Sequence, residues 1–338
     1  MSEIKNLLIL PHLRVQNANA ISSPMTWGFP AMSAFVGLMH ALERRLPEHL
    51  ELEFHSVGVI CHDYQAQVSQ KGYEKRLNLA RSPLASKEDK AKISKDGSFT
   101  APSIVEEGRI NLEITLVFAV DGGACYDDEA GQRVAREVAE VVSGMRIAGG
   151  SVVPAPLGAV SRQRPWLEPL DDDAEARALQ FWKLRRRWLP GFALVCRDDL
   201  LTKRLVKMRE QMPEATPLDA WLDLSRRNHE CRLTQTENKA GEFEEEVSWE
   251  IRRPPGWLVP IPVGYGAISR QFEPGEVASA RDATIPFRFV ESLYSIGQWV
   301  SPHRLTCPEQ LLWYVDNDLD VGLYRLANDF TARHHAIQ

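Results

Sequence analysis

The apolar residues of the first 153 positions switch between the spacing of strands and the spacing of helices, and this order constrains the fold most strongly. A strand shows continuous or alternating apolar residues, whereas a helix repeats them every three or four positions. Met32, Phe35, Val36, Met39 and Leu42 form one such helical stripe between two prolines. The predicted order is strand, helix, strand, strand, helix, strand, at residues 7–15, 30–47, 52–61, 110–120, 130–143 and 146–153.

This order is typical of ferredoxin-like and RNA-recognition folds. We therefore predict an α+β protein with a βαββαβ core over residues 1–155. Beyond it the pattern changes: residues 257–266 look extended, and Phe287, Val290, Leu293 and Tyr294 recur at helical spacing. Together with three further predicted helices, at residues 175–188, 200–212 and 218–226, this indicates that residues 156–338 form a mainly helical and irregular region packing on the core.

Two polar segments differ sharply in charge. Residues 64–104 form a predicted insertion between the second and third strands, with eight Lys and Arg against four acids, in a chain whose formal net charge is −6. It is either a solvated hairpin or an arm that grips a phosphate backbone or a neighbouring subunit. Residues 231–250 are rich in glutamate and resemble an exposed acidic loop, most acidic over 237–250, for which we predict no chemistry.

Composition and motifs argue against several classes of protein. The sequence has neither an apolar run of transmembrane length nor a signal peptide, so we expect a cytoplasmic protein without a membrane partner. Its five cysteines are scattered and odd in number, which favours reduced, buried thiols over disulfides or a zinc site. There is no Walker loop, no HExxH, no Gly-x-Ser-x-Gly and no paired-acid motif. We predict no catalytic residue, no metal and no cofactor.

The crossover from the first strand to the first helix carries the best candidate binding residues. It combines a guanidinium group, several amides and hydroxyls, and an indole ring on which a base can stack. Arg109, Arg146, Gly149 and Gly150 form a second group on or beside the predicted sheet. The first group is Arg14, Gln16, Asn17, Asn19, Ser23 and Trp27.

Each candidate also has a purely structural interpretation. Asn17, Asn19 and Ser23 are ordinary turn formers and helix caps, and Trp27 can be a packed hinge. Gly149 and Gly150 either let the main chain pass close to a phosphate or form a tight turn. The residues alone leave these alternatives open.

Several stretches together resemble the second subunit of the Csy complex, the type I-F CRISPR surveillance assembly. The crossover stretch Gln16–Pro30 is the longest of them. The resemblance covers nearly the whole chain and weakens only at the basic insertion and the acidic segment. The other matching stretches are Ile104–Arg109, Met145–Ser151, Leu189–Val195, Gly256–Pro262, Arg288–Tyr294 and Trp299–Arg304.

This resemblance implies a non-catalytic subunit that caps the repeat-derived 5′ handle of the CRISPR RNA. It also implies contacts with the large subunit and with the first backbone subunit of the complex. Two alternatives remain. One is a metal-independent endoribonuclease that processes repeat RNA with His12 or His62 and Lys71. The other is a protein-only scaffold whose partners hold all the RNA.

Overall fold

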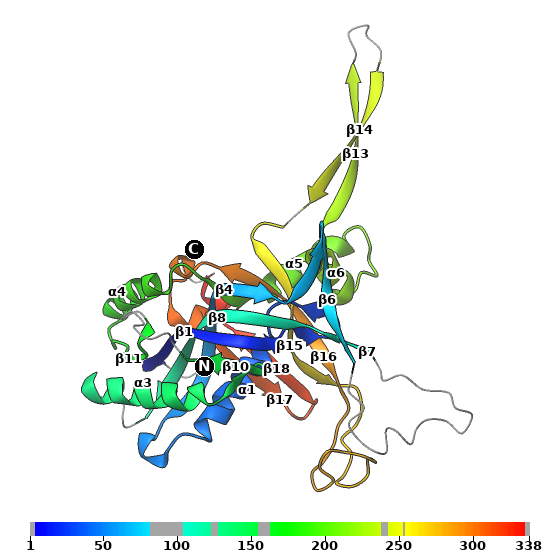
Figure 1. The fold of residues 1–338 in the computed structure, drawn as a ribbon. Helices are drawn as coiled ribbons and strands as arrows, with labels where there is room; N and C mark the ends of the chain where they lie inside the picture. The colour runs from blue at the N-terminus through cyan, green and yellow to red at the C-terminus, as the bar shows by residue number, and fades with distance from the viewer. Residues whose placement is uncertain are drawn as a thin grey trace.

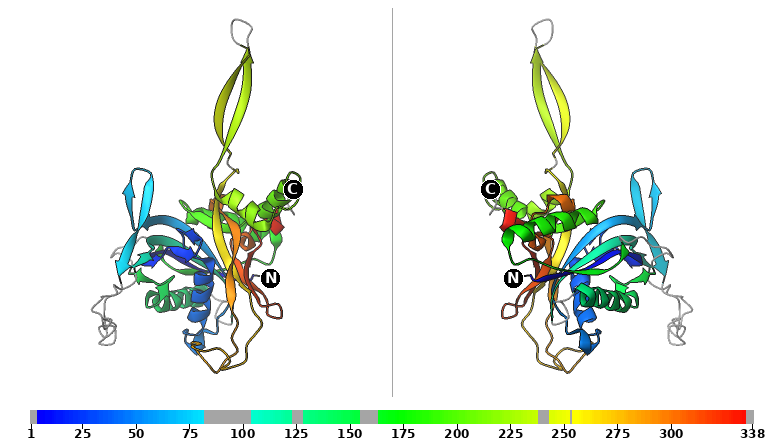
Figure 2. Two further views of the ribbon diagram at one scale, coloured as in Figure 1. Left: turned by 90° about the vertical axis from the view of Figure 1, so that its right-hand side faces the viewer. Right: turned by 90° about the vertical axis from the view of Figure 1, so that its left-hand side faces the viewer.

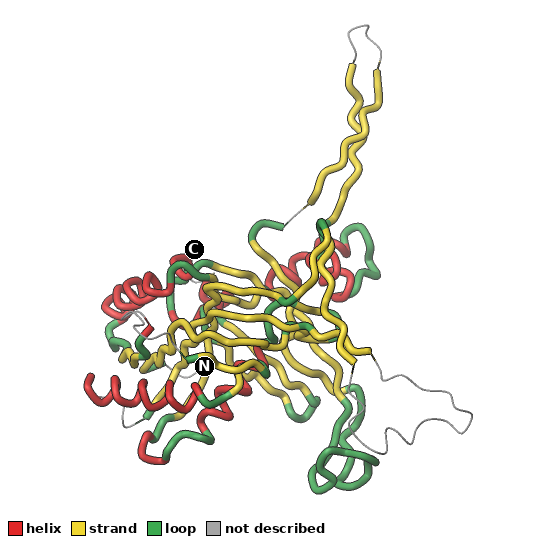
Figure 3. The backbone as a smooth tube through the Cα atoms, viewed as in Figure 1, coloured by secondary structure: helices red, strands yellow, loops and turns green. Residues whose placement is uncertain are grey.

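A single large antiparallel sheet runs through the molecule and joins its two halves (Figures 1 and 3). The computed structural model describes residues 4–81, 104–122, 128–154, 163–237, 243–252 and 254–334. The main sheet has 11 strands, in the order β12-β16-β15-β18-β17-β4-β8-β1-β10-β9, with β11 pairing β1 off this path. None of the described helices is both long and apolar enough to cross a membrane.

All six elements predicted for the N-terminal part are present. In sheet order, the strands run β4-β8-β1-β10 and are antiparallel. Short pieces accompany them: β2 (Ile21–Ser23), β3 (Thr26–Trp27), the 3-10 helix η1 (Glu48–Leu50) and β9 (Arg146–Ile147). The six elements are β1 (Asn6–Asn19), α1 (Met32–Glu43), β4 (Glu53–Ala66), β8 (Arg109–Asp121), α3 (Asp128–Ser143) and β10 (Gly150–Val153).

The two faces of this N-terminal sheet are covered to different extents. Helices α1 and α3 lie on one side of the strands (Figure 2), where Leu8, Leu10 and Val15 of β1 belong to the larger core cluster. On the other side, Leu7 and Ile9 pack in a second cluster formed largely by residues of the C-terminal half. That cover ends before the last third of β1, where Arg14, Gln16 and Asn19 are exposed.

The C-terminal half adds strands to the same sheet. It is joined to β4 through β17 (Trp313–Asp318) and β12 (Phe192–Cys196). The remaining strands of this sheet are β11 (Trp166–Pro169), β15 (Trp257–Ala267), β16 (Val290–Val300) and β18 (Leu323–Asn328). Its helices are α4 (Ala174–Leu184), η4 (Arg185–Trp188), α5 (Asp198–Arg209), α6 (Pro217–Ser225), η5 (Pro302–Arg304), η6 (Pro308–Gln310) and α7 (Phe330–His334).

The predicted α+β fold class with a mainly helical C-terminal region is wrong. The described residues from 163 onward contain eight strands against four α-helices, so the chain is mostly β and its C-terminal half is not mainly helical. The three helices predicted at 175–188, 200–212 and 218–226 are present, but strands outnumber them. The error arose at Phe287–Tyr294, where helical spacing occurs in and just before strand β16. Because β16 is paired on both sides and buried at its centre, it lacks the alternation that marks a half-exposed strand.

The acidic segment is also not a loop. Its described residues form a two-stranded ribbon of β13 (Asn228–Glu237) and β14 (Phe243–Arg252). In the basic insertion, β5 (Val68–Lys71) pairs with β6 (Glu74–Arg81), and β6 pairs with β7 (Ile104–Glu107). The lysines at 87, 90, 92 and 95 lie outside the described residues.

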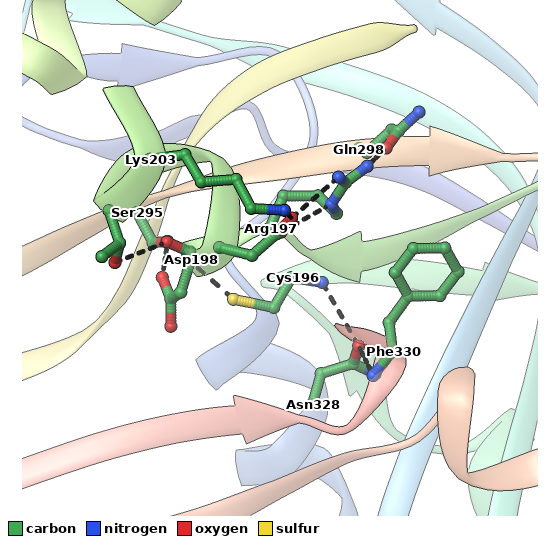
Figure 4. A network of polar contacts seen from close by, with 10 residues as sticks. Cys196, Arg197, Asp198, Lys203, Ser295, Gln298, Asn328 and Phe330 are labelled. Atoms are coloured by element: carbon green, nitrogen blue, oxygen red, sulfur yellow. Dashed lines mark hydrogen bonds and ion pairs between the residues drawn. The ribbon is translucent and has the colours of Figure 1, made fainter. Parts of the chain in front are cut away.

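A polar network ties the C-terminal strands together (Figure 4). The buried amide of Asn328 accepts a hydrogen bond from the Cys196 backbone N–H at 3.3 Å and donates to the Leu312 carbonyl at 2.9 Å. Arg197 forms a fork to Asp199 at 2.8 and 3.0 Å and also donates to Gln298. Buried polar groups are stable only when paired, so these contacts fix β12 against β18 and β16.

Candidate functional site

Half of the predicted binding residues gather on one exposed face of the sheet. Directly opposed residues of antiparallel strands share a face, and Asn19 lies opposite Arg109, whereas Gln16 lies opposite Ser151. Ser151 in turn lies opposite Arg146. We call this surface the polar sheet face; its residues are Arg14, Gln16, Asn19, Arg109, Asn111, Arg146 and Ser151.

Two β-bulges expose this end of β1. The register with β8 shifts between Leu10 and Leu13 and again between Val15 and Ala18. Asn17 sits in the second bulge with φ of 57°, a left-handed conformation that asparagine tolerates better than most residues. The backbone N–H of Asn17 donates to Asn111 Oδ1 at 3.1 Å, and Gln67 donates to the Asn17 side chain. Asn17 is thus a bulge former whose amide group belongs to a cluster of exposed amides.

The polar sheet face carries three guanidinium groups from three strands. The Arg14 side chain is exposed and forms neither a hydrogen bond nor an ion pair with any residue that the structure describes. Arg109 Nη2 is 3.9 Å from Glu107 Oε1, and Arg146 Nη1 donates to the Gly149 carbonyl at 3.2 Å. Exposed pairs of this kind contribute little free energy and exchange readily for other partners. The three arginines are therefore able to bind an anion.

One carboxylate on this face already has a partner. Glu113 lies opposite Arg14 in the register, but its Oε1 is 2.7 Å from His12 Nδ1. His12 stacks on His62 with ring centroids 4.1 Å apart. Both ring nitrogens of His62 are engaged, with the Pro190 carbonyl and with Thr115 Oγ1, each at 2.7 Å. Burial lowers the pKa of His62, although its bond to the Pro190 carbonyl acts in the opposite direction.

Gly150 allows close packing at this edge, and Gly149 forms the turn before it. A Cβ on Gly150 would lie 2.7 Å from both the Ala18 nitrogen and the Gln16 oxygen, so β10 can approach β1 only without a side chain there. Gly149 has φ of +79° and sits in the turn before β10. The backbone N–H of Asn19 donates to the Ala148 carbonyl in that turn at 2.8 Å. Gly150 is thus required by the close approach of β10 to β1.

Trp27 and Ser23 lie apart from these arginines. Ser23 Oγ is 2.6 Å from Thr26 Oγ1 and stabilises the turn between β2 and β3. Trp27, with half of its area exposed, lines a pocket of about 380 Å³ that opens between the crossover and the C-terminal strands. We call it the aromatic pocket; its rings come from Trp27, Phe29, Tyr64, Phe192, Trp257 and Trp299, with Lys75 also lining it.

The crossover separates the aromatic pocket from a second hollow. This hollow, of about 750 Å³, lies between α1 and the turn before β10 and includes Asn19, Arg146 and Gly149. Ser22 lines both spaces, as do the two residues that precede α1. The predicted site is therefore two adjacent regions joined by the crossover.

Sequence reasoning missed the rings that the C-terminal strands contribute. Trp257 and Trp299 fall within stretches noted for their resemblance, but no single stretch shows that they line the same pocket. Their strands, β15 and β16, pair with Trp257 opposite Trp299. Among the described residues, no three His, Cys, Asp or Glu side chains are arranged to hold a metal ion.

Comparison with known proteins identifies the family. The family model described as CRISPR-associated protein (Cas_Csy2) matches residues 8–326. The chain belongs to this family. It is 46% identical over 330 residues to the CRISPR-associated protein Csy2 of Pseudomonas aeruginosa (strain UCBPP-PA14), with 97% of each chain covered. The resemblance to the second subunit of the type I-F Csy complex is thereby confirmed.

Proposed function

We propose that this chain is a non-catalytic subunit of the type I-F CRISPR Csy complex and holds the 5′ handle of the CRISPR RNA on the polar sheet face. The observation that carries the proposal is the register, which brings Arg14, Arg109 and Arg146 from three strands onto one exposed face with amide side chains between them. Guanidinium groups bind phosphates, and amides bind the edges of unpaired bases.

The charge distribution supports a local RNA contact. The chain carries a formal net charge of −6, so its surface as a whole does not attract a polyanion. The polar sheet face differs because Glu113 is engaged by His12, and Arg14 has no partner among the described residues. A short RNA segment is therefore held at one patch, while the rest of the surface remains for other subunits.

The aromatic pocket extends the proposed path of the RNA. The crossover runs from Asn19, on the polar sheet face, to Trp27, in the aromatic pocket. An exposed indole ring is a stacking platform for an unpaired base, and Lys75 supplies a cation beside it. In this proposal the handle crosses the segment 19–27, with phosphates at the arginines and one base at Trp27.

The proposed partners are the large subunit of the complex and the first of its backbone subunits. Family membership supports them, because a Csy2 protein is named for its complex. The endoribonuclease alternative has less support at His62. RNA cleavage at the 2′-hydroxyl needs a base with a free nitrogen, but both nitrogens of His62 have protein partners. Lys71 lies opposite Glu74 in the register, at the end of the β5–β6 hairpin.

The test compares two triple variants of equal charge change in the reconstituted complex. Arg14, Arg109 and Arg146 are replaced by alanine in one. The control replaces Arg44, which directly follows α1, and Arg133 and Arg136 of α3; both helices cover the opposite side of the sheet. We expect the first variant to lower affinity for handle RNA at least about tenfold, and to reduce the salt slope by about 2, as for three lost single-strand phosphate contacts.

Three outcomes would contradict the proposal. Equal losses in the two variants would indicate nonspecific attraction. Unchanged handle affinity in the first variant would favour the protein-only scaffold. Metal-independent cleavage of repeat RNA that is lost in His12→Ala or His62→Ala would establish the endoribonuclease.

A further inference from the structure

The ribbon of β13 and β14 projects from the body of the molecule as an isolated arm (Figures 1 and 2). Its two strands pair over ten positions, from Asn228 opposite Arg252 to Glu237 opposite Phe243. In three directions of view, no other described segment lies beside its outer part. A two-stranded ribbon alone is only marginally stable in water. This arm therefore needs either a strong anchor or a partner.

The two faces of the arm differ in chemistry. Cross-strand partners place Cys231 beside Trp249 and Leu233 beside Val247 on one face. We call this face the apolar stripe; it consists of Cys231, Leu233, Val247, Trp249 and Ile251. Leu233 is 66% exposed and Trp249 is 65% exposed. The other face is polar, with Arg232 beside Ser248 and Glu230 beside Glu250.

An apolar stripe of this size is costly to leave in water. Burying a large apolar side chain contributes roughly 1.5–3 kcal/mol, and the stripe contains a leucine, a valine, a tryptophan and an isoleucine. Contiguous exposed apolar surface on an edge also promotes nonspecific association. Single exposed apolar residues are ordinary, but five on one face of a projecting ribbon indicate a contact surface.

The base of the arm is held rigidly. Asp223, at the end of α6, is 4% exposed and accepts hydrogen bonds from Arg204 Nε at 2.6 Å and from Arg252 of β14 at 2.7 Å. The Asn228 side chain of β13 donates to the Asp223 carbonyl at 2.9 Å. Arg252 also pairs with Glu230 on the opposite strand. Both strands are thereby fixed to the helices, so the direction of the arm is set before any partner arrives.

The charge of the arm selects protein over RNA as its partner. Residues 228–252 contain seven glutamates and three Lys or Arg. A phosphate backbone is repelled by such a segment. An apolar stripe beside acidic side chains instead complements an apolar surface that is bordered by basic residues.

We propose that the apolar stripe docks on another protein subunit of the Csy complex, at an apolar surface with a basic border, with Trp249 as its central anchor. The arm extends outward from a fixed base and presents tryptophan, the residue type most enriched among energetic centres of interfaces. This proposal concerns a surface separate from the polar sheet face, and it does not depend on how the handle is held.

The experiment uses the full chain, the other subunits of the complex and the CRISPR RNA. The stripe variant carries Leu233→Glu and Trp249→Glu. The control carries Thr234→Glu and Ser248→Glu, which alter the other face of the same strands by the same charge. We expect the stripe variant to lose affinity for the remaining subunits at least about tenfold and the control to retain it. Affinity of each variant for handle RNA is measured separately and should not change.

A labelling experiment detects the same contact without any substitution. Cys231 is an exposed free thiol within the stripe, whereas Cys61 and Cys196 are buried. We expect alkylation of Cys231 to be slowed several-fold in the assembled complex relative to the isolated chain, with Cys307 as an internal reference.

Each contrary result overturns the proposal. The stripe variant assembling as tightly as the control would show that the stripe is not an interface. Loss of handle binding with intact subunit binding would assign the arm to RNA. A stripe-dependent dimer of the isolated chain that persists in the complex would assign it to a second copy. Far-ultraviolet circular dichroism and the melting temperature check that both variants fold.

Discussion

The polar sheet face and the arm are both exposed antiparallel strands, but they differ in what supports them. Behind Arg14 and Gln16 lies Val15, which is buried against the core, so this surface is held by packing and needs no partner for its shape. Behind Trp249 there is only the other face of the same ribbon. A surface supported by a core can remain polar, whereas an unsupported ribbon with an apolar face is stabilised by contact. The two surfaces therefore suit different classes of partner.

Among the substitutions at the two compared surfaces, the largest effect is expected at the base of the arm. Asp223→Asn removes the carboxylate shared by Arg204 and Arg252 and leaves two arginines without their acceptor. We expect the free energy of unfolding to fall by roughly 3 kcal/mol, as for a broken buried pair. Urea denaturation measures it. An unchanged value would mean that the arm is anchored by other contacts.

The pH dependence of stability tests the same carboxylate. Burial alone would raise the pKa of Asp223, but the hydrogen bonds from Arg204 and Arg252 outweigh it and the pKa is lowered from 3.8. A lowered pKa means that the stabilisation is present above pH 3.8 and is lost as the pH falls through the folded-state pKa. Denaturation measured from about pH 5 to about pH 2 should show a steeper loss of unfolding free energy in the natural chain than in Asp223→Asn.

A smaller loss is expected at the edge of the polar sheet face. Gly150→Ala places a Cβ against the main chain of β1, which cannot move away as a flexible side chain would. We expect a loss of about 2 kcal/mol in unfolding free energy, together with weaker handle binding. Gly37→Ala, on α1 with no atom within 4 Å of the added Cβ, is the control and should be neutral or stabilising. If Gly150→Ala lowered the unfolding free energy but left handle affinity unchanged, the turn before β10 would not be part of the proposed RNA site.

Arg14→Ala should separate binding from stability. Because Arg14 has no partner among the described residues, we expect its removal to change the unfolding free energy by less than about 0.5 kcal/mol. Handle affinity should fall several-fold, and the slope of its logarithm against the logarithm of salt concentration should fall by about 0.7. Titrations at several salt concentrations measure both. A variant that binds equally well at every salt concentration would remove Arg14 from the proposed site.

The smallest effect on the isolated chain is expected in the apolar stripe. Trp249→Ala should leave the unfolding free energy within about 0.5 kcal/mol of the natural value, because the ring is 65% exposed. Phe118→Ala, at a fully buried position of β8, should cost about 3–5 kcal/mol in the same assay. A large loss at Trp249 would show that the stripe packs within the chain.

Local patterns in the sequence predicted the elements of residues 7–153 because each has an uninterrupted periodicity of its own. The helix of residues 30–47 was recognised from its stripe and its flanking prolines, and α1 occupies Met32–Glu43. The ribbon was missed for a local reason. Its glutamates dominate the composition of residues 231–250, and they hid the alternation of Cys231 and Leu233 that marks a strand.

Part of the candidate site could be predicted from the sequence. Arg14, Gln16 and Asn19 could be placed near each other because they are close in the sequence. That Trp27 is displaced into the aromatic pocket depends on the β2–β3 turn, where Ser22 and Ser23 bond to Thr26. The pocket itself needs Trp257 and Trp299, which are more than 200 positions away in the sequence. Their proximity follows from the pairing of β15 and β16 and not from any local pattern.

The sequence by itself determined the family, most of the N-terminal elements and the residue types able to bind a polyanion. These depend on short-range periodicity and on side-chain chemistry, which a linear pattern records. Tertiary structure alone decided that one sheet unites both halves, that three arginines share a face, and that the acidic segment is an amphipathic arm. Those features depend on which strands pair and in which register, and register is set by burial summed over the whole molecule.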